Sequence, residues 1–211
     1  VISDIGLFEN LKKVSLAVNF YKKMTGIGES LSSILNHSNI TSINISGNST
    51  TGQFVSGYAL ENEAIPFIRH LYTNNSLEEL DISGNLIGDA GIKMINEILR
   101  ENNKLKVINI DNNGIKNIET INDFLDSVSE SKSIINAVFP VDDVYDLLSD
   151  ELSTMTKNVE TISLKRQIAQ KVTMNNRSKS GFYSSLSLLN DKTLDDIVDE
   201  ATWITRKNWN W

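Results

Sequence analysis

A pattern of apolar residues and one asparagine recurs at a nearly constant interval through the first half of this chain. Its clearest copy reads Leu77-x-x-Leu80-x-Ile82-x-x-Asn85-x-Ile87 and is followed by Gly88-Asp89-Ala90-Gly91-Ile92. The next copy begins 28 residues later and reads Leu105-x-x-Ile108-x-Ile110-x-x-Asn113-x-Ile115. A repeat of this length predicts a solenoid, in which each unit buries its apolar face only by stacking on its neighbours.

Three weaker copies extend the pattern on both sides. They read Leu11-x-x-Val14-x-Leu16-x-x-Asn19-x-Tyr21, Ile40-x-x-Ile43-x-Ile45-x-x-Asn48-x-Thr50 and Ile134-x-x-Ala137-x-Phe139-x-x-Asp142. The repeats therefore start near residues 11, 40, 77, 105 and 134. The last copy has Asp in place of Asn and contains Pro140, as expected for an atypical repeat that ends the stack.

Each copy predicts a strand, a turn and a helix. In the third copy Leu80 and Ile82 alternate with acids, so a strand puts the apolar and acidic side chains on opposite faces. Strands are predicted near residues 14–16, 42–45, 79–82, 107–110 and 136–139. The asparagines are predicted to form a buried ladder that bonds backbone groups of the neighbouring coil, and they are Asn19, Asn48, Asn85 and Asn113. Residues 51–63 are predicted to be an inserted loop, followed by a helix over 65–72 with Pro66 in its first turn. Asn102 falls in a helix-to-strand turn, where we expect it to be exposed and its loss to cost little.

The two clear copies, together with the Gly-Asp-Ala-Gly after the asparagine, resemble the ribonuclease-inhibitor-like subfamily of leucine-rich repeats. The resemblance covers about residues 7–145. It implies an α/β leucine-rich repeat solenoid with a parallel inner sheet and outer helices. We therefore expect a solenoid over residues 1–142 and a helical C-terminal region, acting as a cap, over residues 143–211.

The C-terminal region follows helical spacing without the repeat. A helix is predicted over 143–157 with Asp142 or Asp143 at its N-cap, and residues 159–164 are open to a second interpretation as a short strand. Further helices are predicted over 165–175, 183–189 and 192–207. The basic residues between 165 and 179 are interpreted as a solvated helix face in preference to a phosphate-binding surface. The tryptophans Trp203, Trp209 and Trp211 are interpreted as a seal on the solenoid core in preference to a ligand cage.

Composition narrows the functions open to the chain. Its 211 residues carry a net charge of −7, which argues against a general nucleic-acid binder. No run of eighteen apolar residues occurs, so no membrane span is expected. The chain has no cysteine, unlike the cysteine-capped extracellular proteins of the family that it resembles. A glycan on Asn48 would also be incompatible with a buried ladder residue. We therefore expect a cytoplasmic location, or secretion into the cytosol of a host cell.

No combination of residues predicts catalysis, a metal site or a cofactor. His37 and His70 are the only histidines, and neither has partners at a spacing that would form a general base or a metal site. The segment Gly26-Ile27-Gly28 is too short for a phosphate loop and lacks its lysine. We expect that the chain is not an enzyme.

The candidate site is the solvent-facing side of the predicted sheet. Seven residues are predicted to contact a partner there: Lys13, Asn44, Glu79, Asp81, Val107, Asn109 and Asp111. Because they are expected to face solvent, packing would not dictate their identity. Their acids favour a protein partner with a basic patch, and the alternative is a merely soluble surface.

The resemblance implies a non-enzymatic module, here expected to be a monomer, that binds a protein partner on its concave sheet. The preferred setting is an intracellular bacterial effector that acts on a host protein, a virulence role. Two alternatives stay open. One is a eukaryotic cytoskeletal or scaffold repeat protein, similar to the actin-capping tropomodulin group. The other is the substrate-recognition part of a larger enzyme.

Overall fold

The structure is a computed structural model that describes residues 2, 4–5, 8–20, 24–37, 39–48, 59–138, 140, 142–144 and 146–147. Most of the predicted C-terminal region, including its tryptophans and its basic residues, lies outside the described residues. So do residues 51–58 of the predicted loop over residues 51–63, whereas Glu61–Glu63 of that segment form a short 3-10 helix.

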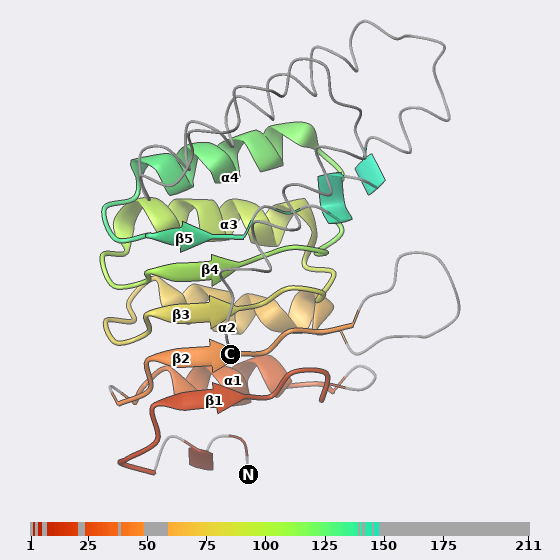
Figure 1. Ribbon diagram of the computed structural model, residues 1–211. Coiled ribbons are helices and arrows are strands. Elements are labelled where there is room, and N and C mark those ends of the chain that lie inside the picture. The colour runs from red at the N-terminus through yellow and green to blue at the C-terminus, as the bar shows by residue number, and fades with distance from the viewer. Residues whose placement is uncertain are drawn as a thin grey trace, which may run out of the picture.

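Parallel strands form one sheet in chain order (Figure 1). They are β1 (Lys13–Ser15), β2 (Ser42–Asn44), β3 (Glu79–Asp81), β4 (Val107–Asn109) and β5 (Asn136–Ala137). Successive strands begin 29, 37, 28 and 29 residues apart. The predicted period is therefore confirmed, including the longer second repeat.

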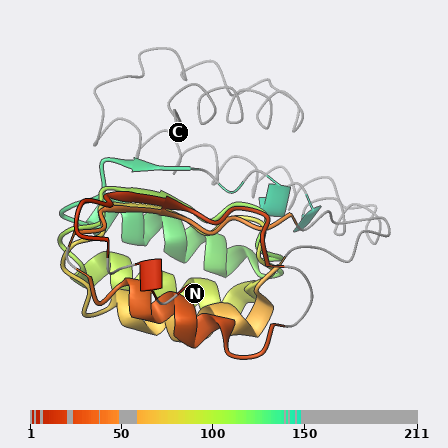
Figure 2. The same cartoon turned by 90° about the horizontal axis from the view of Figure 1, so that it is seen from below.

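Helices cover one face of this sheet, as the view in Figure 2 shows. They are α1 (Ile27–Ile34), α2 (Ala64–Leu71), α3 (Gly88–Glu101) and α4 (Ile118–Glu130), and a short 3-10 helix, η2 (Glu61–Glu63), precedes α2. Pro66 lies in the first turn of α2, where its missing N–H would have no helical partner. The predicted α/β leucine-rich repeat solenoid is confirmed in the described residues.

An apolar core lies between the sheet and the helices. The middle residues of the first four strands enter it, and they are Val14, Ile43, Leu80 and Ile108. The helices contribute, among others, Leu31, Phe67, Ile95 and Phe124. Because alternate residues of a strand face opposite sides, the residues that flank each middle residue lie on the other face of the sheet. This face, turned away from α1–α4, is called the inner face below.

Two asparagines form a buried polar ladder just beyond the strands. Asn85 Nδ2 donates to the carbonyl oxygens of Ile45 (2.9 Å) and Ile82 (3.1 Å). Asn113 Nδ2 donates to those of Ile82 (3.1 Å) and Ile110 (2.7 Å). The backbone N–H of Asn85 also donates to Asn113 Oδ1 at 3.1 Å, so the ladder joins consecutive repeats. These bonds satisfy buried backbone groups that would otherwise lack partners.

The ladder is shorter than predicted at its N-terminal end. Asn19 and Asn48 are exposed, and Asn19 Nδ2 donates to the carbonyl oxygen of Ala17 within its own turn. Asn48 lies in the long segment between β2 and α2, whereas Asn85 lies in the short segment between β3 and α3. A glycan on the exposed Asn48 would therefore disrupt no buried ladder, so this position gives no support to a cytoplasmic location.

At its C-terminal end the ladder continues through Asp143, one residue beyond the predicted Asp142. The Asp143 carboxylate accepts the N–H groups of Asn113 and Ile115, both at 2.9 Å. Ladder residues are 28 apart between Asn85 and Asn113 but 30 apart between Asn113 and Asp143. Residues 142–144 and 146–147 are helical, so the predicted helix begins at this point.

A second polar ladder, which the repeat pattern did not predict, runs along the opposite edge of the sheet. Asn102 Nδ2 donates to the carbonyl oxygens of Leu71 (3.2 Å) and Asn74 (3.1 Å). Asn102 Oδ1 accepts the N–H groups of Lys104 (2.8 Å) and Leu105 (2.9 Å). The expectation that Asn102 lies in an exposed turn is therefore corrected.

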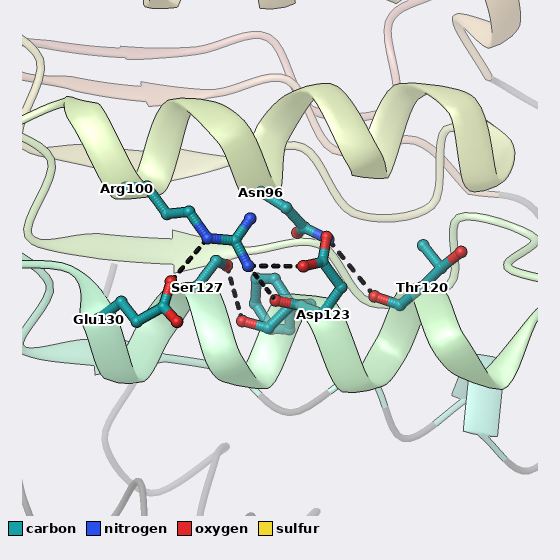
Figure 3. A network of polar contacts seen from close by, with 7 residues as sticks. Asn96, Arg100, Thr120, Asp123, Ser127 and Glu130 are labelled. Atoms are coloured by element: carbon teal, nitrogen blue, oxygen red, sulfur yellow. Dashed lines mark hydrogen bonds and ion pairs between the residues drawn. The ribbon is translucent and has the colours of Figure 1, made fainter.

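A charged network joins α3 to α4 on the helical side of the molecule (Figure 3). Arg100 Nη2 lies 2.5 Å from Asp123 Oδ1, and Arg100 Nε lies 2.7 Å from Glu130 Oε2. Asn96 Nδ2 donates to Asp123 Oδ2 at 2.8 Å. Burial raises the pKa of Asp123, but the hydrogen bonds from Arg100 and Asn96 and the charge of Arg100 lower it more. The network thus links the helices that follow β3 and β4.

Candidate functional site

The inner face carries two rows of side chains that the strand register defines. The first row is Lys13, Ser42, Glu79, Val107 and Asn136. The second row is Ser15, Asn44, Asp81 and Asn109. The structure thus brings six of the seven candidate residues together on adjacent strands. The seventh, Asp111, lies two residues beyond β4.

Two ion pairs lie in or beside the first row. Lys13 Nζ lies 3.1 Å from Glu79 Oε2, and this ion pair spans the intervening strand, where Ser42 is buried. Lys106 Nζ lies 2.9 Å from Glu78 Oε1. Burial raises the pKa of Glu79, but the nearby Ser42 hydroxyl, the hydrogen bond from Lys13 and the charges of Lys13 and Lys106 lower it more. Lys13 and Lys106 therefore both counter the negative charge of Glu79.

This arrangement changes the electrostatic character expected of the face. Glu79 is ionised but is balanced by two lysines, so it is not a free acid that would attract a basic partner. The Lys13 and Glu79 side chains are 64% and 36% exposed, and solvent screens their attraction. Each such exposed pair contributes less than about 1 kcal/mol to the free energy of unfolding.

In the second row, three side chains each accept a hydrogen bond from the backbone N–H two residues later, in the turn that follows the strand. The bonds join Ser46 N to Asn44 Oδ1 (2.9 Å), Ser83 N to Asp81 Oδ1 (3.0 Å) and Asp111 N to Asn109 Oδ1 (3.1 Å). Only a short side chain with an oxygen acceptor reaches the backbone two residues on. The expectation that packing does not dictate these residue types is therefore corrected. The signal was present in the sequence as Asn, Asp and Asn at equivalent positions.

Asp81 differs most from its predicted role as an exposed acid. It is only 6% exposed, and its carboxylate accepts the Ser83 hydroxyl at 2.7 Å and Asn109 Nδ2 at 3.3 Å. Burial raises the pKa of Asp81 by more than these hydrogen bonds lower it. Asp81 therefore holds the turn after β3 and the neighbouring Asn109, and it offers little surface to a partner.

Asp111 also has partners within the chain. Its Oδ1 accepts the N–H groups of Asn112 and Asp142, both at 2.9 Å. Burial, together with the carboxylates of Asp142 and Asp143, raises the pKa of Asp111 to about 7. It joins the end of the fourth repeat to the segment that follows β5.

An open cavity of about 290 Å³ lies at the edge where the helices lead into the strands. It is lined by Leu35, Asn36, His70, Thr73, Asn74, Asn75 and Ser76. His70 Nδ1 lies 3.1 Å from the carbonyl oxygen of Pro66, four residues earlier in α2. None of the seven candidate residues lines this cavity.

The described residues contain no group of His, Asp and Glu side chains placed to hold a metal ion. They also contain no helix with the length and apolar character needed to cross a membrane.

Comparison with known proteins places the fold among characterised structures. The actin-binding site 2 structure of leiomodin-1 matches with a TM-score of 0.50 and 15% identity, over 84% of this chain and 95% of that one. The tropomodulin C-terminal domain of Caenorhabditis elegans matches with a TM-score of 0.48 and 14% identity, over 84% of this chain and 92% of that one. At such low identity the leiomodin match shows the fold alone.

A sequence relative comes from Dictyostelium discoideum. Its Rho GTPase-activating protein gacW is 31% identical over 108 residues, which are 49% of this chain and 9% of that protein. The chain thus spans less than a tenth of this relative. No protein-family model matches the sequence.

Proposed function

We propose that this chain is a non-enzymatic protein-interaction module that binds a protein partner on its inner face. The observation that carries the proposal is the ordering of that face. Turn bonds fix Asn44 and Asn109 at the ends of β2 and β4. A surface whose polar groups are already held in place loses little side-chain entropy on binding.

The residues proposed to contact the partner are Lys13, Asn44, Glu79, Val107 and Asn109. Val107 is half-buried and supplies apolar area in the same row as the ion pair. Asp81 and Asp111 support this face through bonds within the chain. Because Lys13 and Lys106 balance the adjacent acids, a basic patch on the partner is not required.

We prefer a eukaryotic cytoskeletal or scaffold setting, in the cytoplasm, over a bacterial effector. Two observations support this preference: the structural match is to the actin-binding site 2 of leiomodin-1, and the sequence relative is from a eukaryote. No comparison supports a role in virulence. Actin is accordingly the first partner to test, and a monomeric state is proposed for the module.

The test uses purified actin and two matched variants. Ser15→Arg with Val107→Arg adds two bulky cations to the inner face without removing a turn acceptor. Lys93→Glu changes an exposed residue of α3 on the helical side. If actin is the partner, the wild type and Lys93→Glu co-sediment with it equally. The double variant then binds at least tenfold more weakly, with an unchanged circular dichroism spectrum. Failure of the folded wild type to bind actin would refute this partner.

A second candidate function is the recognition part of a larger regulator of GTPases. The match to part of a Rho GTPase-activating protein favours it. In that case the module would bind a Rho-family GTPase or another component of the same pathway. Fluorescence anisotropy with a purified Rho-family GTPase, loaded with GDP or a GTP analogue, separates this candidate from actin binding.

A further inference from the structure

Two aspartates tie the last described segment to the fourth repeat in opposite directions. Asp111, in the repeat, accepts the N–H of Asp142 at 2.9 Å. Asp143, in the segment, accepts the N–H groups of Asn113 and Ile115, also at 2.9 Å. We call these five residues the aspartate latch. It holds residues 142–144 against the fourth repeat.

The latch brings like charges together at a half-buried place. Asp142 and Asp143 lie close enough to Asp111 to raise its pKa to about 7, together with burial. Burial also raises the pKa of Asp143, and the charge of Asp146 adds to the effect. Repulsion between ionised carboxylates therefore weakens the attachment of this segment to the fourth repeat.

Hydrogen bonds to Asp111 act against this repulsion. The N–H groups of Asn112 and Asp142 donate to its carboxylate, both at 2.9 Å. A protonated carboxyl keeps a carbonyl oxygen as acceptor for the Asp142 N–H and loses its charge. Protonation of Asp111 thus keeps the geometry and removes the repulsion.

We propose that the aspartate latch is a pH-sensitive device that holds residues 142–144 against the fourth repeat when Asp111 is protonated and loosens when Asp111 ionises. The sign follows from linkage. Asp111 binds a proton more tightly in the latched state than in the released state, where its usual value of 3.8 applies. The latch is therefore strongest at low pH and weakens as pH rises from about 4 to about 7.

Amide hydrogen exchange, measured by NMR on the full chain, tests the proposal. The probes are the N–H groups of Asn113, Ile115 and Asp142, corrected for the intrinsic pH dependence of exchange. Their protection is expected to be about tenfold greater at pH 5.5 than at pH 7.5. In Asp111→Asn, which mimics the protonated side chain, protection stays high at both pH values. The matched control Glu97→Gln, on the exposed face of α3, behaves as the wild type.

A second variant keeps the test decisive if Asp111→Asn does not fold. Asp142→Asn removes one repelling charge but keeps the backbone N–H that Asp111 accepts. The midpoint of the protection change is then expected at lower pH than in the wild type. Protection that is independent of pH in the wild type overturns the proposal, as does an unaltered pH dependence in Asp111→Asn or, if that variant is unfolded, in Asp142→Asn. Neither result depends on what binds the inner face.

Discussion

The side chain of Asn102 donates from Nδ2 to the backbone oxygen of Asn74 at 3.1 Å, across the 28 residues that separate equivalent positions of neighbouring repeats. Asn74 repeats the contact one step earlier, because its Nδ2 donates to the carbonyl oxygen of Leu35 at 2.7 Å. A polar ladder therefore runs along the edge where helices lead into strands. The ladder of Asn85 and Asn113 runs along the other edge, so the two repeats that contain Asn85 and Asn113 are held at both ends of their strands.

Asn102→Ala is expected to lower the free energy of unfolding by about 1–3 kcal/mol, because it removes four hydrogen bonds from a partly buried turn. Urea denaturation followed by circular dichroism measures the change. The control is Asn103→Ala, at the exposed neighbouring position, with an expected change below about 0.5 kcal/mol. Equal losses in the two variants would contradict a structural role for the second ladder.

Asn85→Ala is expected to cost about 1–3 kcal/mol, because Asn85 is fully buried and its amide serves three carbonyl oxygens. Asn48→Ala occupies the equivalent template position but is exposed, so its expected cost is near zero. Thermal unfolding of the pair compares one template position in two environments. A stable Asn85→Ala protein would show that water replaces the amide without loss.

The repeat period was enough to predict the sheet. Apolar residues at fixed offsets identified the strands and their parallel order, because only stacking buries those residues in every repeat. The period did not predict the ladder ends. Asn48 matches the template as well as Asn85 does, yet Asn48 is exposed and Asn85 is buried. In the last repeat, Asp143 continues the ladder one residue later than the template position, which is Asp142.

The sequence predicted correctly that Glu79 and Asp81 lie on one face of the sheet, but it did not predict their partners within the chain. Strand alternation put Glu79 and Asp81 on the same face, yet alternation carries no information about their partners. Lys13 reaches Glu79 from two strands away, a contact that depends on sheet register. Asp81 is held by Ser83, two residues later, and this local turn could have been recognised in the sequence.

Backbone conformation after the strands gives a further prediction. Gly84 has a φ of 67°, and a Cβ there would lie 2.7 Å from the carbonyl oxygen of Gly47. Gly84→Ala is therefore expected to cost about 2 kcal/mol or more, from left-handed strain and the clash. Val18 occupies the equivalent turn with a φ of 57° and is 42% exposed. Val18→Gly should leave stability within about 1 kcal/mol of the wild type, on the stabilising side. Thermal unfolding in which Val18→Gly is the more damaging change would contradict this account.

The ion pair on the inner face is expected to be weak. A double-mutant cycle with Lys13→Ala and Glu79→Ala should give a coupling energy below about 1 kcal/mol, because both side chains are at least one-third exposed. The coupling should shrink further in 1 M salt, where screening acts over about 3 Å. A coupling well above this value would mean that the pair is a principal support of the sheet. Replacing it would then not be a clean test of binding.

The most direct measurement of the central claim is affinity capture from a eukaryotic cell lysate, quantified by mass spectrometry. It compares the wild type with Ser15→Arg plus Val107→Arg and with Lys93→Glu. If the inner face binds a partner, the wild type and Lys93→Glu capture equal amounts of that protein. The folded inner-face variant captures at least tenfold less of it. If the folded inner-face variant retains every protein that the wild type captures, the inner face is not the binding surface.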